Sequence, residues 1–398
     1  MSTRPRPPFR ALTEFLRTEA GSAAILLAAA FIALVIANSG LAGAYNQLLH
    51  TEVGAAIGPF DLKADLQHWI NDGLMTIFFF VVGLEIKREL AVGALSDRRV
   101  AALPVIAALG GMLAPAAVYL ALAGGQPAAG GWGIPIATDI AFAVGVLTLF
   151  GHRLHPGLRV FLLTLAIADD VGAIVVIAVA YSNDVSMAWL GVAAAGLLIM
   201  ASMRRWARSP LAYVLPGTLV WLAMWESGIH PTLAGVAVAF LTPAHPIEGR
   251  PVLEELEGAI HPFSSYVVLP LFALANAGVR LVGGEFQEAV SSPAFRAVVG
   301  GLLLGKVLGV AGGVWLALRA KWATLPFGVS LRMIMAMAPL AGIGFTVSLF
   351  IAQLSFDPGV LLDASKIGIL LGSLVAALIG AAALLLASRR RSPRLASD

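Results

Sequence analysis

Two adjacent aspartates, Asp169 and Asp170, lie inside the apolar segment FLLTLAIADDVGAIVVIAVA, which is long enough to cross a lipid bilayer. Each acidic side chain at the centre of a membrane helix costs about 2.5 to 3.5 kcal/mol on insertion scales. Packing cannot explain this cost for two neighbouring carboxylates, whereas a binding site for protons or cations can. The pair is therefore the first candidate for chemistry in this chain.

Carboxylates are hard oxygen ligands of the kind that Na+ requires, and a Thr hydroxyl and free backbone carbonyls can complete its coordination. Burial favours the protonated carboxylate and a nearby lysine favours the ionised one, so titration can fall in the physiological range. Adjacent acids also titrate as a coupled set. We expect protons to compete with Na+, and also with Li+, for one shared site, which is the basis of antiport.

Two further isolated charges lie at membrane depth, Asp139 and Lys306, and Lys306 is the only lysine near the middle of a predicted span. Asp139 belongs to GWGIPIATDIAFAVGVL (131–147), which, like APLAGIGFTVSLFIA (338–352), contains Pro and Gly and is expected to be interrupted. If these helices cross in opposite senses, their amino ends attract an anion and their carboxyl ends a cation. Asp139 and Lys306 can supply these charges. An alternative for one of the two segments is a simple proline kink. The alternatives for Lys306 are snorkelling to the membrane surface, or pairing with one of the two aspartates.

Composition indicates a membrane protein around these segments. Hydrophobic residues make up 59% of the chain, charged residues make up 12%, and the mean hydropathy is +0.88, whereas soluble domains contain about 25% charged residues. The basic residues form short clusters between apolar segments, so the net charge of +3 reports membrane topology and not nucleic-acid binding. With no cysteine, the chain has neither disulfides nor thiolate metal ligands.

Hydropathy predicts an all-α membrane protein with 12 transmembrane helices, of which spans 4 and 11 are the interrupted pair of an inverted structural repeat. The predicted spans are 20–38, 69–92, 101–123, 134–150, 157–181, 187–203, 211–225, 228–242, 254–279, 297–318, 333–355 and 363–388. With both termini cytoplasmic, 21 of the 26 Lys and Arg residues lie inside and four lie outside. We expect the first span to be retained. The first outer segment is predicted as either a small β-hairpin or a plain loop.

Eight sequence motifs closely resemble the bacterial sodium/proton antiporter NhaA family, in the same order, over about residues 10 to 385. They are HWINDGLM (68–75), FFFVVGLEIKREL (78–90), PIATDIAFAVGVL (135–147), LTLAIADDVGAI (163–174), GIHPTLAGV (228–236), LPLFALANAGV (269–279), LLLGKVLGV (302–310) and GIGFTVSLFIA (342–352). The resemblance implies a multi-pass protein of the bacterial inner (plasma) membrane that exports Na+ in exchange for H+ and uses no cofactor.

The resemblance also implies roles for the buried charges. Asp169 and Asp170 form the ion-binding and proton-carrying site, and Thr138 lies near it. Asp139 and Lys306 compensate the dipoles of the crossed helices, and Lys306 pairs with Asp169. Because adjacent helical residues point about 100° apart, we hypothesise that Asp170 is the essential cation ligand and Asp169 the lysine partner. Two proton carriers per Na+, either both aspartates or Asp170 with Lys306, make transport electrogenic.

A charged group at the cytoplasmic end of span 2 matches residues that the family associates with pH sensing. Glu85, Arg88 and Glu89 share one helix face through their spacing, and Glu257 in the run EELEGAIH is assigned to the same group, with His261 nearby. From spacing alone, a solvated helix end with ordinary ion pairs explains the first three residues equally well. The family resemblance favours a funnel whose charge gates ion access.

Two residues near the outer side are matched in the same way. Asp72 corresponds to an intramembrane acid near the entry to span 2, in the group assigned to pH sensing or ion entry, and His230 corresponds to an outer histidine linked to the pH response. The alternatives are a boundary acid at the membrane surface for Asp72 and an ordinary polar residue in a turn for His230.

The predicted organisation is one transporter domain (1–398). It comprises a core bundle (about 101–181 and 297–388) and an interface bundle (about 10–92 and 187–279). Homodimer contacts through the outer hairpin are implied by the resemblance, and the lipid bilayer is the other expected partner.

Three rival functions fit the sequence less well than antiport. A sodium-coupled organic-anion symporter shares interrupted helices but needs an organic substrate, and a channel conducts far faster than a carrier. An intramembrane aspartyl protease needs two carboxylates facing across one substrate, which two adjacent residues of one helix do not provide. We therefore predict a transporter and not an enzyme.

Overall fold

The computed structural model describes residues 19–389, apart from 55, 58–59, 62, 126, 151–153, 183–184, 204–209 and 245–250. Both chain ends, with the basic clusters used to place them in the cytoplasm, lie outside these residues. Within the described part, six helices are long and apolar enough to cross a membrane, and three bent helix pairs raise the number to nine. The protein is therefore an all-α membrane protein with a small β-hairpin.

The six long helices include three that contain a π-helical turn. These three are α4 (Leu66–His68) with η1 (Trp69–Leu74) and α5 (Met75–Ala91), α12 (Val252–Phe263) with η6 (Ser264–Val268) and α13 (Leu269–Asn276), and α15 (Pro293–Gly300) with η7 (Gly301–Gly305) and α16 (Lys306–Arg319). The other three are α6 (Arg98–Ala123), α8 (Pro156–Ala180) and α19 (Val360–Arg389). Turns of π-helix are common at functional sites, and here they lie in the helices that carry Asp72, Ser264 and Lys306.

Two of the three bent pairs are the helices that proline and glycine predicted to be interrupted. The first combines η3 (Ala128–Ile136) with α7 (Ile140–Thr148), and the second combines α17 (Leu331–Met337) and η8 (Ala338–Gly342) with α18 (Phe345–Ser355). Each bends by 43° at its break. Spans 4 and 11 are therefore interrupted as predicted, because Pro135 and Pro339 lack the amide proton that a continuous helix needs at these positions.

Three further apolar helices coincide with the remaining predicted spans but are shorter than a full crossing requires. They are α9 (Met187–Met203), α10 (Val214–Ser227), which follows η5 (Pro210–Tyr213), and α11 (Thr232–Leu241). The total of twelve spans and the inverted repeat stay predictions. Short connecting helices are η2 (Ala94–Ser96) and α14 (Gly284–Ser291).

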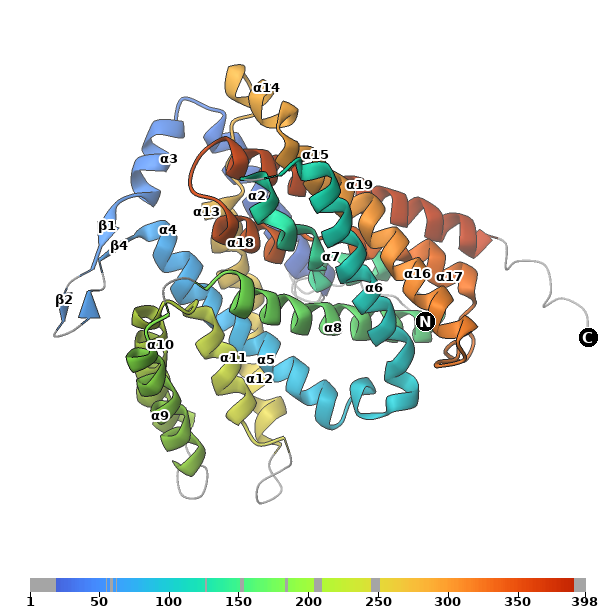
Figure 1. Ribbon diagram of the computed structural model, residues 1–398, viewed down its shortest axis with the longest axis horizontal. Helices are drawn as coiled ribbons and strands as arrows, with labels where there is room; N and C mark the ends of the chain where they lie inside the picture. Colours follow the sequence, from blue (N-terminus) through green and yellow to red (C-terminus); the bar gives the residue numbers. More distant parts are fainter. Residues whose placement is uncertain are drawn as a thin grey trace, which may run out of the picture.

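The first outer segment contains the hairpin and a helix that the sequence did not predict. After α2 (Glu19–Ala37), the chain turns by 116° into α3 (Ala42–Leu49). Strands β1 (Glu52–Val53) and β4 (Ala64–Asp65) then pair antiparallel, as do β2 (Ala56–Ile57) and β3 (Phe60–Asp61). This pairing confirms the hairpin, which projects from one edge of the molecule in Figure 1.

Asp65 connects the hairpin to the start of the following helix through hydrogen bonds. Its carboxylate contacts His50 Nδ1 at 2.8 Å and His68 Nδ1 at 2.7 Å, and it accepts the backbone N–H of His68 at 2.8 Å. Burial alone would raise the pKa of Asp65, but these hydrogen bonds from His50 and His68 outweigh it and lower that pKa. The hairpin therefore ends on an N-terminal helix cap.

The helices gather into two groups that pack mainly among themselves. In Figure 1, α6, α15, α16 and α19 lie on one side, α5, α9, α10, α11 and α12 lie on the other, and α8 runs between them. Helices α6 and α16 approach so closely that a Cβ added to Gly110 would lie 2.2 Å from the carbonyl oxygen of Gly309. Small residues permit such packing between membrane helices. This contact brings the start of α16, and with it Lys306, towards the breaks of the interrupted helices.

Candidate functional site

The two interrupted helices touch each other at their breaks. The backbone N–H of Asp139 donates to the carbonyl of Ile343 at 2.6 Å, and the Thr138 hydroxyl lies 2.9 Å from the carbonyl of Ala341. Ala137 and Ile343 are extended, so they interrupt both helical ladders at the same depth. Backbone groups freed in this way need partners inside the protein, and each break supplies some for the other.

Asp139 caps the amino ends of both half-helices that begin at the breaks. Its Oδ1 accepts the N–H of Phe142 in α7 at 3.2 Å. Its Oδ2 accepts the N–H of Thr346 in α18 at 3.0 Å and the Thr346 hydroxyl at 2.6 Å. One carboxylate therefore lies against the partial positive ends of two helices, the arrangement that favours a buried anion.

Lys306 lies at the carboxyl end of η3 and is fully buried, with 0% of its surface exposed. Its Nζ donates to the carbonyl of Ile136, the last residue of η3, at 2.6 Å and to the Thr138 hydroxyl at 3.1 Å. A third donor contact reaches Asp169 Oδ2 at 2.7 Å. All three ammonium protons therefore have acceptors, which excludes the interpretation that Lys306 snorkels to the membrane surface.

Asp169 uses only one of its two carboxylate oxygens in this network. Its Oδ2 receives hydrogen bonds from Lys306 at 2.7 Å and from Thr138 at 2.6 Å. Its Oδ1 is buried and has no hydrogen-bond partner among the residues that the structure describes. A buried carboxylate oxygen without a donor is costly, so this atom is available as a cation ligand.

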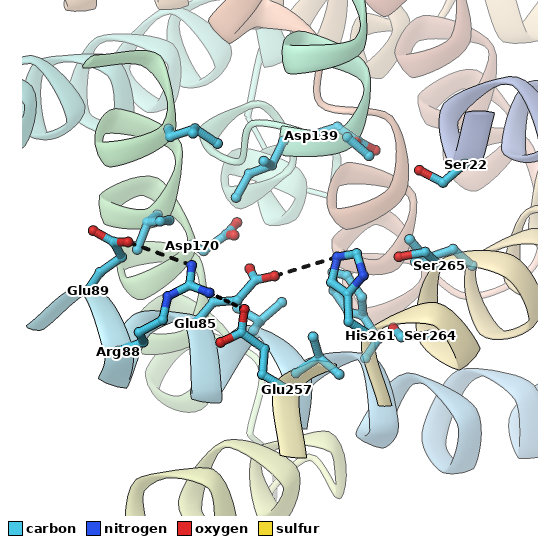
Figure 2. Close-up of a pocket in the computed structure, with 18 of the residues that line it drawn as sticks. Ser22, Glu85, Arg88, Glu89, Asp139, Asp170, Glu257, His261, Ser264 and Ser265 are labelled. Atoms are coloured by element: carbon cyan, nitrogen blue, oxygen red, sulfur yellow. Dashed lines mark hydrogen bonds and ion pairs between the residues drawn. The ribbon is translucent and has the colours of Figure 1, made fainter. Parts of the chain in front are cut away.

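Asp170 points into a different environment from its neighbour. It borders a cavity of about 580 Å³ that is also lined by Thr138, Asp139 and Thr346. Figure 2 shows the carboxylates of Asp170 and Asp139 facing this space, with the charged residues of α5 and α12 opposite. Asp169 is therefore paired with Lys306, whereas its neighbour Asp170 faces a cavity.

The charged group at the end of α5 lines the same cavity. Arg88 forms an ion pair with Glu257 of α12 and lies 3.7 Å from Glu89, and His261 lies 3.8 Å from Glu85 (Figure 2). Glu257 Oε2 is buried without a hydrogen-bond partner in the described part of the chain. These predicted residues therefore meet on the cavity that reaches Asp170.

Asp72 and His230 are brought together elsewhere. Asp72 Oδ1 lies 3.3 Å from His230 Nε2, and His230 Nδ1 contacts the Thr232 hydroxyl at 2.8 Å. Neither Asp72 nor His230 lines the cavity around Asp170. The two residues predicted near the outer side thus form a separate polar pair.

Five hydroxyl residues of the cavity were not singled out from the sequence. They are Ser22, Thr164, Ser264, Ser265 and Thr346. Thr346 is the second residue of α18, after Gly344 and Phe345, so it does not occupy the N-cap position at which a hydroxyl residue signals a helix start. The serines carry no local signal either, because only packing brings α2 and η6 to this cavity.

The fold and the site together define a class of protein, the membrane transporters built around interrupted helices. The family model described as Na+/H+ antiporter 1 matches residues 13–384. Among similar proteins, Na(+)/H(+) antiporter NhaA 1 of Klebsiella pneumoniae is 45% identical over 97% of this chain and 98% of its own. Na(+)/H(+) antiporter NhaA of Escherichia coli strain K12 is 47% identical over 93% and 96%, and that of Yersinia pseudotuberculosis is 48% identical over 93% and 94%. The chain belongs to the Na+/H+ antiporter 1 family, a known example of this class.

Proposed function

We propose that the protein exports Na+, and also Li+, from the cytoplasm in exchange for H+ by letting cation and protons compete for Asp170 and Asp169. Family membership supports Na+/H+ exchange, and the relatives are named as Na(+)/H(+) antiporters. The observation that carries the proposal is the unequal setting of the two aspartates. Asp169 is held by Lys306, whereas Asp170 faces a cavity.

The oxygen atoms around the breaks suit a small hard cation. We assign to Na+ the Asp170 carboxylate, the Thr138 hydroxyl and the Oδ1 of Asp169, which has no hydrogen-bond partner among the described residues. A cation binds only when these carboxylates are ionised, and protonation removes the charge that holds it. The carrier reorients when either the cation or the protons are loaded, so the two cannot travel in the same direction.

The exchange is electrogenic in this proposal because two protons are carried for each Na+. The second carrier beside Asp170 is either Asp169 or Lys306, which lie 2.7 Å apart. If Asp169 binds the proton, its ion pair with Lys306 opens when the site is loaded. If Lys306 carries it, the lysine loses its proton as Na+ binds, because a cation bound at Asp169 disfavours a second positive charge beside it.

The proposed setting is the bacterial inner membrane, with both termini in the cytoplasm and with two copies joined through the hairpin. In this orientation, the cavity opens towards the cytoplasm. The polar groups that line the cavity, including the ion pair between Arg88 and Glu257, then meet Na+ arriving from inside.

Proton release by Na+ in everted membrane vesicles tests the exchange and the role of Asp170. We expect Na+ and Li+, but not K+, to release protons from acidified wild-type vesicles without any organic substrate. Asp170→Asn should reduce the rate about 100-fold or more, because it removes an ionised buried ligand. The matched control is Asp357→Asn, which makes the same change in an exposed loop. Wild-type rates in Asp170→Asn would contradict the assignment.

We further propose that the charged group of Glu85, Arg88, Glu89 and Glu257 sets the pH range of exchange, and that Asp72 with His230 contributes from the outer side. Glu85 shares the cavity with Asp170, so its negative charge disfavours ionisation of Asp170. Glu85→Gln should therefore move the acid limb of the activity profile to lower pH by about half a unit. An unchanged profile, measured in the same vesicles, would exclude the role of Glu85.

A further inference from the structure

Four amide side chains form a cluster at the end of the interrupted helix α18 that lies away from the break. Asn276 is fully buried at the end of α13, and its Oδ1 accepts hydrogen bonds from Gln67 at 3.1 Å, Asn71 at 3.3 Å and Gln353 at 2.7 Å. Its Nδ2 donates to Asn71 Oδ1 at 2.7 Å. We call Gln67, Asn71, Asn276 and Gln353 the amide cluster. In the orientation proposed above, it lies on the outer side.

An aromatic layer lies one or two helical turns deeper in the membrane than the amide cluster. Phe79 follows Asn71 by eight residues, Phe272 precedes Asn276 by four, and Phe350 precedes Gln353 by three. The ring centroids of Phe79 and Phe350 are 5.3 Å apart, and those of Phe272 and Phe350 are 6.3 Å apart. All three rings are buried. Apolar constrictions of this kind exclude ions and water.

The amide cluster and the aromatic layer are built from the same three chain segments. These are the continuous helix formed by α4, η1 and α5, the end of α13, and α18. The first two belong to the predicted interface bundle, and α18 belongs to the predicted core bundle. Among the described residues, only the hydrogen bond from Gln353 to Asn276 connects amides of the two bundles.

We propose that the amide cluster is a latch that holds the outer route closed while the cavity at Asp170 is open to the cytoplasm. The inference rests on the proposed exchange, in which the site faces the two sides of the membrane in turn. The aromatic layer excludes ions, and the hydrogen bond from Gln353 to Asn276 holds the two bundles together above it.

Uncharged amides suit this task for two physical reasons. They do not titrate, so the hydrogen bond from Gln353 to Asn276 does not itself depend on pH in the range in which the carboxylates change charge. A titratable group does pack on the aromatic layer, since the ring centroid of His230 lies 5.1 Å from that of Phe350 and its Nε2 lies 3.3 Å from Asp72 Oδ1. The amides also exchange a protein partner for water at a modest cost, since a neutral hydrogen bond contributes little net free energy. An ion pair at this position would attract the transported cation and hold it outside the site.

Cysteine labelling tests the latch directly because the natural chain contains no cysteine. Met75 is fully buried and lies four residues after Asn71 and four before Phe79, between the amide cluster and the aromatic layer. In Met75→Cys, we expect slow reaction with a membrane-impermeant maleimide added outside intact cells in Na+-free buffer. Adding Gln353→Leu should raise the rate about fivefold, as expected for the loss of one neutral hydrogen bond. Gln353→Met, which keeps an unbranched side chain, should act in the same way.

The internal control is Gln67→Leu in the same Met75→Cys background. It removes amide hydrogen bonds that stay within one bundle, so we expect an unchanged rate. Equal rates with and without the Gln353 changes would overturn the proposal, as would an equal increase from Gln67→Leu. Only variants with a wild-type profile in fluorescence-detected gel filtration are compared. The labelling rate tests the latch and does not require transport. Absence of Na+-driven proton release in the wild type would contradict the proposed exchange, and the labelling result could still be read separately.

Discussion

The two interrupted helices have the same geometry but different chemistry at their breaks. Both bend by 43°. The break between η3 and α7 carries two polar side chains, Thr138 and Asp139, whereas the break between η8 and α18 is formed by Ile343 and Gly344, directly after Gly342 at the end of η8. The second helix receives its cap from the first, because Asp139 accepts hydrogen bonds from Thr346.

This asymmetry shows how a crossing of two broken helices can be stabilised with a single acid. A second carboxylate at this depth would add about 2.5 to 3.5 kcal/mol to the cost of the site. Glycine instead lets backbones approach each other, since a Cβ on Gly342 would lie 2.4 Å from the carbonyl oxygen of Leu302. The first break therefore contributes the capping carboxylate, and the glycines at the second break allow close approach of the backbones.

Removing the carboxylate of Asp139, which caps both half-helices, should cause the largest loss of stability. Asp139→Ala leaves the N–H groups of Phe142 and Thr346 without their carboxylate. Two lost caps at about 1 kcal/mol each, plus buried donors without acceptors, predict a loss of about 3 kcal/mol or more. The thermal midpoint of the purified protein should fall by several degrees. A wild-type midpoint would mean that Asp139 does not stabilise both helix ends.

Filling the space at the second break should have a smaller effect. Gly342→Ala forces the new methyl group against the backbone of Leu302, which cannot move aside like a side chain. Overpacking of this kind costs about 1 to 3 kcal/mol. Gly312→Ala on α16 is the matched control, since a Cβ there meets no atom within 4 Å. Equal thermal midpoints for these two variants would contradict the role of close approach.

Removing one hydrogen bond between the breaks should have the smallest effect. Thr346→Val keeps the shape of the side chain and the backbone bond to Asp139 but loses the hydroxyl bond of 2.6 Å. We expect a loss of about 1 to 2 kcal/mol, because the acceptor is a buried carboxylate. Thr218→Val serves as the control, since that hydroxyl bonds only within its own exposed turn of α10. The comparison fails if both variants shift the thermal midpoint equally.

Local signals predicted the interruptions, the hairpin and most of the charged site. Pro135 and Pro339 mark the breaks because proline cannot donate to the helical ladder, and the alternation around turn residues in the first outer segment marked the hairpin as one of two alternatives. Helix α3 was missed because its eight residues are too few for a helical pattern to be recognised in the sequence. The single charges Asp139 and Lys306 were found because isolated charges at membrane depth are rare.

Contacts between distant segments could not be predicted from the sequence in the same way. Gln353 and Asn276 lie 77 residues apart, and each alone is an ordinary polar residue near the end of an apolar helix. The serines of the cavity are ambiguous for the same reason. Their environment depends on how whole helices pack, which no local pattern of residues records.

The sequence by itself determined that buried carboxylates, one buried lysine and two broken helices occur together in a membrane protein, because hydropathy and the cost of buried charge are properties of local composition. Only the tertiary structure decided which of the two aspartates contacts the lysine. It places Lys306 on Asp169 and leaves Asp170 on the cavity, because α16 packs against α6 and brings the lysine to the carboxyl end of η3. The two neighbouring aspartates differ because of that packing, although the chain presents them as identical residues.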